Sequence, residues 1–211
     1  MTDNLGKQEA LWRGDFGDAY IDRNVVSNQK LSALTRHWAR ILRTMDGSPP
    51  KSIAEVGANI GLNFRAMRRL TEADFLAIEP NAKARERLVA DEIVPAERAI
   101  DGMCQSVPLP DGAADLAFTS GVLIHIHPDD LLPACKEIHR IAKRYVVCVE
   151  YFADKPETVV YRGETEALFK RDFGAFYLDN FPDLRVVDYG FTWKQLTGLD
   201  NLNWWVFKKG S

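Results

Sequence analysis

Hydrophobic positions along the chain fall into two alternating patterns. Over residues 28–45 they recur every three or four positions, which is the spacing of the buried face of a helix. A short apolar run, SIAEVGA at 52–58, follows and has a glycine near its end, which is typical of a buried strand that leads into a turn. Runs of both kinds then alternate toward the C-terminus, which predicts a parallel sheet flanked by helices.

The same patterns locate the other elements. We expect helices at 61–70, 81–91, 127–143 and 165–181, and strands at 74–80, 114–121, 144–152, 184–193 and 202–209. No helical pattern separates the last two strands, so one of them should run antiparallel at the sheet edge or pair with its neighbour as a hairpin. The predicted fold is α/β: a Rossmann-like, seven-stranded, mostly parallel sheet with helices on both faces and one antiparallel edge strand.

No linker-like segment divides the chain. Its 211 residues, 46% of them hydrophobic, are enough for one substantial core. We therefore expect a single domain over 1–211, with residues 1–45 forming an N-terminal lid and a helix packed on it. Residues 1–27 lack a regular period, which suits the lid.

Charge and cysteine content narrow the class of protein. A formal net charge of −3 gives no general attraction to nucleic acid or to anionic lipid, so any anion site must be local. The chain begins without the pattern of a secretory signal and has no apolar run of bilayer length, which favours a cytoplasmic protein without membrane contact. Three cysteines without CxxC spacing favour reduced thiols, and we expect no metal site.

Acidic residues end the first two predicted strands. Glu55 precedes Gly57 and Gly61 in an ExGxxxG spacing, and Glu79 closes the second strand. A carboxylate at the first turn would repel a phosphate but suits an ammonium or sulfonium group, while the two oxygens of Glu79 can accept both hydroxyls of a ribose. A ribose with a cation and no phosphate describes S-adenosylmethionine. The alternatives are that Glu55 and the glycines form an ordinary tight turn and that Glu79 is a solvated strand end.

Three blocks of the sequence resemble the class I S-adenosylmethionine-dependent methyltransferases. They are EVGANIG at 55–61, the acid Glu79, and the stretch GMCQSVPLPDGAADLAFTSGVLIHI at 102–126. The resemblance implies that the loop around Met103 wraps the adenine; the family commonly has Asp at that position, so backbone groups or Gln105 would substitute here. The candidates for cofactor binding are Glu55, Gly57, Asn59, Gly61, Glu79, Pro80, Met103, Cys104, Gln105 and Ser120.

A closer resemblance extends over most of the chain. The segments LWRGDFGDAYIDRN, GVLIHIHPDDL, YRGETEALFKRDFG and VVDYGF look like those of the methyltransferases encoded with pseudaminic acid biosynthesis, a bacterial nonulosonic-sugar pathway. This resemblance implies a small, anionic acceptor molecule. We expect a monomer or a homodimer.

Methyl transfer requires alignment of the acceptor and exclusion of water, and an acceptor that is not already an anion also needs a base. His125 follows the fourth predicted strand and is the candidate catalytic residue; the alternative is a packed structural histidine. The enzyme could therefore methylate an anionic metabolite directly, or an amine or hydroxyl deprotonated by His125. A non-catalytic cofactor-binding partner of another enzyme is the third alternative.

Two segments supply candidates for binding the acceptor. Residues Tyr161, Arg162, Lys170 and Arg171 concentrate positive charge around a predicted turn and helix start, which suits an anion pocket, although they could equally form a solvated helix face. In the N-terminal segment, Tyr20, Arg23 and Asn24 would face the ligand if the lid closes. The alternative there is a packed arm.

Overall fold

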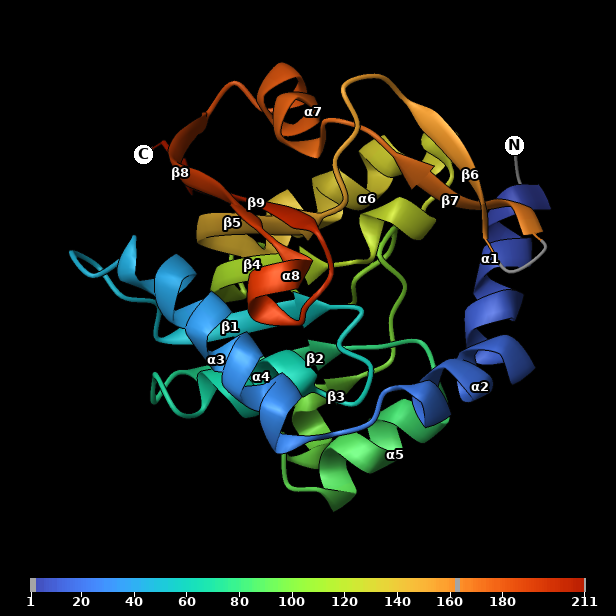
Figure 1. The fold of residues 1–211 in the computed structure, drawn as a ribbon, viewed down its shortest axis with the longest axis horizontal. Helices are drawn as coiled ribbons and strands as arrows, with labels where there is room; N and C mark the ends of the chain where they lie inside the picture. Colours follow the sequence, from blue (N-terminus) through green and yellow to red (C-terminus); the bar gives the residue numbers. More distant parts are fainter. Residues whose placement is uncertain (1–2, 162–163, 211) are drawn as a thin grey trace.

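A seven-stranded sheet forms the centre of the protein in the computed structural model, which describes residues 3–161 and 164–210 (Figure 1). The strand order is β3-β2-β1-β4-β5-β9-β8, and β3, β2, β1, β4 and β5 are mutually parallel. Their bounds are β1 Ser52–Val56, β2 Asp74–Ile78, β3 Ala99–Ile100, β4 Ala114–Ser120, β5 Ala142–Glu150, β8 Leu184–Thr192 and β9 Leu202–Lys209. The predicted α/β fold is confirmed.

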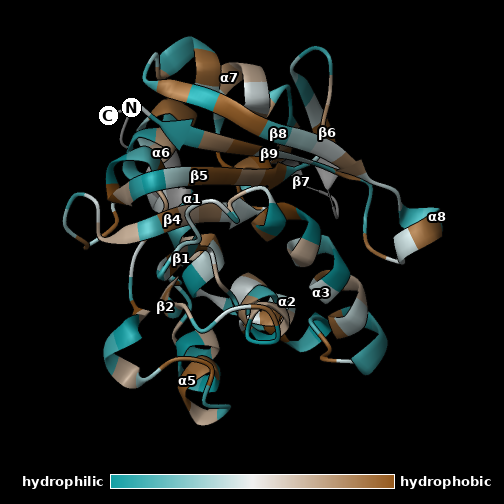
Figure 2. Ribbon diagram, turned by 90° about the vertical axis from the view of Figure 1, so that its left-hand side faces the viewer, coloured by the Kyte–Doolittle hydropathy of each residue, from teal (hydrophilic) through white to brown (hydrophobic). Residues whose placement is uncertain are grey.

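Helices cover both faces of this sheet. Trp38 of α3 and Phe64 of α4 are buried with one face of the strands, whereas Ile138 of α6 and Tyr177 of α7 are buried with the other. Figure 2 shows hydrophobic colour along the central strands, whereas the surrounding helices carry both hydrophobic and hydrophilic colour. The helices are α3 Asn28–Arg43, α4 Leu62–Met67, α5 Ala82–Ala90, α6 Pro128–Ile141, α7 Phe173–Asn180 and α8 Lys194–Thr197, with short 3-10 turns η1 Ala96–Arg98 and η2 Leu123–His125.

The edge of the sheet next to β5 is a hairpin. Strand β9 runs antiparallel to both of its neighbours, β5 and β8. The antiparallel strand therefore belongs to the hairpin at the sheet edge, as expected, with β9 as its inner strand and β8 as its outer strand. Within the part of the chain that the structure describes, no helix has the length and apolar character needed to cross a membrane.

The prediction of a continuous helix over 165–181 is wrong. Strands β6 (Glu157–Tyr161) and β7 (Glu164–Lys170) form a separate antiparallel pair, and a helix starts only at α7. Leu168 and Phe169 are both buried, so tertiary packing on two faces stabilises an extended segment where the local pattern was ambiguous. Asp172 caps the helix by accepting a hydrogen bond from the Ala175 backbone amide at 2.9 Å.

The N-terminal segment, expected to be irregular, is helical. It forms α1 (Asp3–Arg13) and α2 (Asp15–Arg23), which lie along the end of the domain toward which β1, β2 and β4 point (Figure 1). The arm is held there by polar contacts to the segments after β2 and β3: Arg13 bonds Asp101 after β3 at 2.8 Å, and Asp18 accepts from Nδ2 of Asn81 after β2 at 2.9 Å. Ile21 of α2 is also buried, in a small apolar cluster with Ile60 and Ala84, so polar and apolar contacts together hold the arm.

Candidate functional site

A cavity opens at the carboxyl ends of β1, β2 and β4. Strands β1 and β4 are neighbours from which the chain leads away in opposite directions, and such a switch point is where open α/β sheets bind ligands. Helices α1 and α2 cover the cavity. Among the described residues its lining includes Trp12, Gly17, Tyr20, Asn24, Glu55, Gly57, Asn59, Asn63, Glu79, Pro80, Asn81, Met103, Cys104, Ser120, Val122 and His125.

The turn after β1 brings backbone close to this cavity. Gly57 has φ +81, and a Cβ atom there would lie 2.5 Å from Cγ2 of Val122, so the position requires glycine on both counts. Gly61 has φ +73 and starts α4, but it does not itself line the cavity. Its Cβ would lie 2.7 Å from Cδ2 of Leu88, so Gly61 allows the turn and α4 to pack against α5.

Glu55 is a buried acid with one oxygen unused. Its Oε1 accepts a hydrogen bond from Nδ2 of Asn63 at 2.6 Å, whereas its Oε2 is buried and has no hydrogen-bond partner among the described residues. Burial raises the pKa of Glu55 well above its ordinary value, with a further increase from the charge of Glu79, and the bond from Asn63 opposes the shift. A cation entering the cavity would find here an acceptor that the protein leaves unsatisfied.

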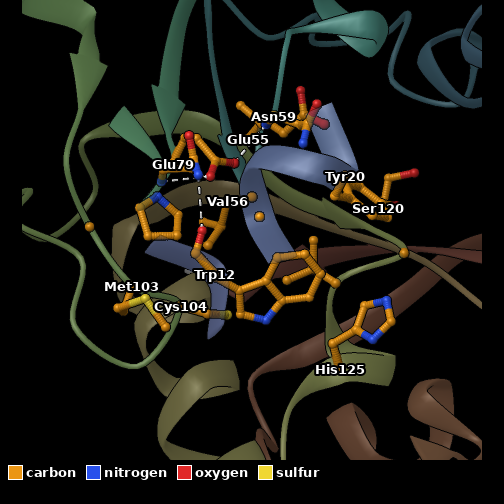
Figure 3. Close-up of a pocket in the computed structure, with 18 of the residues that line it drawn as sticks. Trp12, Tyr20, Glu55, Val56, Asn59, Glu79, Met103, Cys104, Ser120 and His125 are labelled. Carbon is orange, nitrogen blue, oxygen red and sulfur yellow. Dashed lines mark hydrogen bonds between the residues drawn. The ribbon is translucent and has the colours of Figure 1, made fainter. Parts of the chain in front are cut away.

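Glu79 accepts hydrogen bonds from the backbone after both β1 and β2. Its Oε2 accepts from the backbone amide of Asn59 at 2.8 Å and its Oε1 from that of Asn81 at 2.9 Å (Figure 3). Burial raises the pKa of Glu79, although these two backbone bonds and the charge of Arg85 oppose the shift. Each carboxylate oxygen has a second lone pair, so both can still accept a hydroxyl group.

The N-terminal arm closes the cavity from above. The Trp12 indole extends across it between the Cys104 loop and His125 (Figure 3), with its ring 5.2 Å from that of His125. Nδ2 of Asn81 donates to the Trp12 backbone oxygen at 3.1 Å, and Nδ2 of Asn24 donates to Oδ1 of Asn59 at 3.3 Å. The sequence analysis quoted Trp12 within the segment LWRGDFGDAYIDRN and gave it no role. Its place in the same segment as Tyr20 was the available signal.

The loop after β3 supplies an apolar wall. Met103 and Cys104 are buried and line the cavity, as the resemblance implied, but Gln105 does not line it. Both polar atoms of the Gln105 amide are buried without a hydrogen-bond partner among the described residues. The expected role of this amide at the adenine therefore has no support in the geometry.

The segment after β4 forms the opposite wall. Ser120 ends the strand, and His125 lies on η2, where its backbone oxygen accepts from Nε2 of Gln8 at 2.7 Å. Glu150, which the sequence analysis missed, holds this segment from below: its Oε1 accepts from the backbone amides of Val122 at 3.1 Å and Leu123 at 3.0 Å. Burial raises the pKa of Glu150 to about 7, and these bonds oppose the shift.

Arg23, Lys170 and Arg171, the predicted basic residues that the structure describes, do not line this cavity. Among the described residues, Arg23 packs on the Tyr20 ring at 5.2 Å, Lys170 on that of Tyr151 at 5.7 Å, and Arg171 on that of Phe176 at 5.1 Å. Lys170 is the last residue of β7 and Arg171 follows it, so neither lies at the predicted helix start. Arg162 and the side chain of Tyr161 lie outside the described residues. Of the expected acceptor-binding set, the structure brings Tyr20 and Asn24 to the site.

The segment that carries this site matches a known family. Residues 54–149 match the methyltransferase domain family, and they include the turn after β1, Glu79 and the loop after β4. This part of the chain is therefore similar to a methyltransferase domain. Strands β1 to β5 lie within the matched range or extend just beyond it, while the N-terminal arm and the strands after β5 lie outside it. The chain matches no curated protein sequence.

Solved structures with the same fold include several methyltransferases. A SAM-dependent methyltransferase from Leishmania major superposes with a TM-score of 0.74 at 18% identity, covering 96% of this chain and 82% of that one. The 1,6-didemethyltoxoflavin-N1-methyltransferase of Burkholderia thailandensis gives 0.72 at 17%, covering 98% and 90%. Magnesium protoporphyrin IX methyltransferase from Synechocystis gives 0.65 at 12%, covering 100% and 99%. At these identities the likeness establishes the fold. With the methyltransferase domain, it supports the predicted enzyme class, a methyltransferase dependent on S-adenosylmethionine.

Proposed function

We propose that this chain transfers a methyl group from S-adenosylmethionine to a small anionic metabolite, such as a sugar acid, a carboxylate or a phosphonate. The observation that carries the cofactor assignment is the pair of buried acids at adjacent strand ends. Glu55 leaves one buried oxygen without a partner in the described structure, and Glu79 keeps free lone pairs on both oxygens. No positively charged side chain of the described chain lines this cavity, so its acids suit a cationic ligand.

The residues present fit the cofactor group by group. Glu55 would accept from its ammonium group, Glu79 would accept from the ribose hydroxyls, and the wall of Met103 and Cys104 would cover the apolar base. When bound, the cofactor supplies an electrophilic methyl group. The protein aligns the acceptor with it and, through α1 and α2, excludes water. Two solved methyltransferases of the same fold, from Burkholderia with S-adenosylhomocysteine and from Synechocystis with SAM, support the choice of cofactor.

A second reading has His125 as a general base for an amine or hydroxyl acceptor. The observation that favours it is position, because His125 lies at the end of the cavity beside Ser120 and beneath the Trp12 ring. A side chain there could take a proton from an acceptor. The sequence resemblance to the pseudaminic acid-associated methyltransferases supports the anionic acceptor as the first choice.

The cofactor assignment is tested by isothermal titration with S-adenosylhomocysteine and separately with NAD. We expect saturable binding of the first alone; binding of NAD instead would end the proposal. Radiolabelled methyl transfer into a panel of sugar acids, phosphonates and carboxylates, each paired with its neutral ester or amide, then tests the acceptor class. Preference for the neutral member of every pair would contradict the anionic acceptor.

A further inference from the structure

A second cavity adjoins the first. It lies between the N-terminal half of α3, the end of β4 and the segment from α8 to β9. The two cavities share a rim that includes Ser120 and His125, where a molecule in one can approach a molecule in the other. The residues that line both are Tyr20, Asn24, Leu62, Asn63, Ser120, Gly121 and His125.

The two cavities carry opposite charge. Among the described residues, the charged groups lining the first are Glu55 and Glu79, whereas those lining the second are Lys30, Lys194 and Asp200. The second cavity therefore has a formal excess of one positive charge. Such an arrangement attracts an anion to the side of the shared rim opposite the cationic cofactor.

Lys30 is the group best placed to hold that anion. It lies in the first turn of α3 and is half-buried, and burial lowers its pKa while the charge of Asp200 opposes the shift. Asp200 is itself in contact with Lys194, whose Nζ lies 3.4 Å from Oδ1. Asp200 thus pairs with Lys194 and acts on Lys30 only through its charge, so the half-buried Lys30 ammonium gains from a counter-charge of its own.

His37 adds a neutral polar group to the same wall. Its pKa is lowered to about 4 by burial and by the charge of Arg40, so at pH 7 the ring is uncharged. Its Nδ1 lies 3.0 Å from Oγ1 of Thr192, which fixes the orientation of the ring. The cavity therefore combines one surplus cation with a neutral hydrogen-bonding side chain, a combination that suits a polar acceptor with a single acidic group.

We propose that the second cavity is the acceptor site and that Lys30 binds the carboxylate or phosphate-like group of the acceptor, leaving its methyl-accepting atom at the rim beside His125. The inference rests on the proposed methyl-transfer function. Of the basic residues expected in the 161–171 segment, Lys170 stacks on the ring of Tyr151, which lines the cavity, and does not line the cavity itself. Lys30 acts by binding and takes no part in bond making.

The experiment compares Lys30→Gln and Lys30→Arg with Lys136→Gln, an exposed lysine on α6 that lines neither cavity. Each protein is saturated with S-adenosylhomocysteine, and inorganic phosphate and acetate are then titrated separately at constant ionic strength while the melting temperature is followed. We expect saturable stabilisation by at least one anion in the wild type and in the Lys136 control. Lys30→Gln should weaken it by about tenfold, the usual effect of losing one charged hydrogen bond, and Lys30→Arg should restore most of it.

Titration with S-adenosylhomocysteine separates the two ways of failing. If the wild type does not bind S-adenosylhomocysteine, the proposed function is overturned. If wild type and Lys30→Gln bind S-adenosylhomocysteine equally and also respond equally to the anion, only the acceptor site is overturned. No anion response in the wild type overturns it as well.

A second measurement needs no variant. In the wild type loaded with S-adenosylhomocysteine, phosphate or acetate should protect Lys30 from acetylation by acetic anhydride, with Lys136 as the internal control. Equal labelling of Lys30 with and without the anion would overturn the inference.

Discussion

Glu150 allows a quantitative test of the burial beneath the site. Burial raises the pKa of this carboxyl group from 4.5 to about 7. Between these values the unfolded chain releases a proton that the folded chain keeps, so the stability contributed by this group is present at low pH and is lost as pH rises. The slope is about 1.4 kcal/mol per pH unit, which gives about 3 kcal/mol over the full window.

The perturbation is Glu150→Gln, which keeps a carbonyl oxygen for the amides of Val122 and Leu123 but cannot ionise. We expect the free energy of unfolding of the variant, relative to wild type, to rise by about 3 kcal/mol between pH 4.5 and pH 7.5. Urea denaturation followed by tryptophan fluorescence at several pH values measures this difference. The control is Glu86→Gln on α5, where an exposed carboxyl is solvated in both states. A flat or falling difference for Glu150→Gln would refute the reasoning.

Three further predictions concern the cofactor cavity. Gly57→Ala should lower the melting temperature more than Gly121→Ala does. Both glycines have positive φ, but only a Cβ at position 57 would clash, with Val122. An equal loss of melting temperature in the two variants would contradict this. Binding of S-adenosylmethionine should release protons and tighten as pH rises, because the raised pKa of Glu55 falls when Glu55 pairs with an ammonium group. Calorimetry in buffers of different ionisation enthalpy measures the number of protons released. Glu55→Gln should abolish the part of this release that comes from Glu55. His125→Ala should lower methyl transfer by about 10²-fold or more while product affinity stays unchanged, if that residue is the base; a parallel loss of both would point to packing.

The sequence predicted those parts of the structure that local chemistry decides. Glu55 and Glu79 stood at strand ends that short apolar runs and glycines mark clearly, and both reach the cavity. The alternation of elements likewise predicted the parallel sheet, since buried strands between amphipathic helices have few other ways to pack.

The parts that sequence analysis missed depend on contacts between distant segments. Glu150 is joined to the loop after β4 across 28 positions, and Lys30 reaches the second cavity only because α3 packs beside the strand ends. The sequence of β7 was taken for the start of a helix, because the burial of both Leu168 and Phe169 depends on distant segments and does not show in the local pattern.

The central claim is that buried acids recognise a cationic nucleoside without phosphate. The most direct test is a calorimetric cycle with wild type and Glu55→Gln, each titrated with S-adenosylhomocysteine and with 5′-methylthioadenosine, which has no ammonium group. Wild type should prefer the first ligand, and Glu55→Gln should lose most of that preference while binding the second ligand as before. An equal loss for both ligands, or no preference in the wild type, would contradict the account.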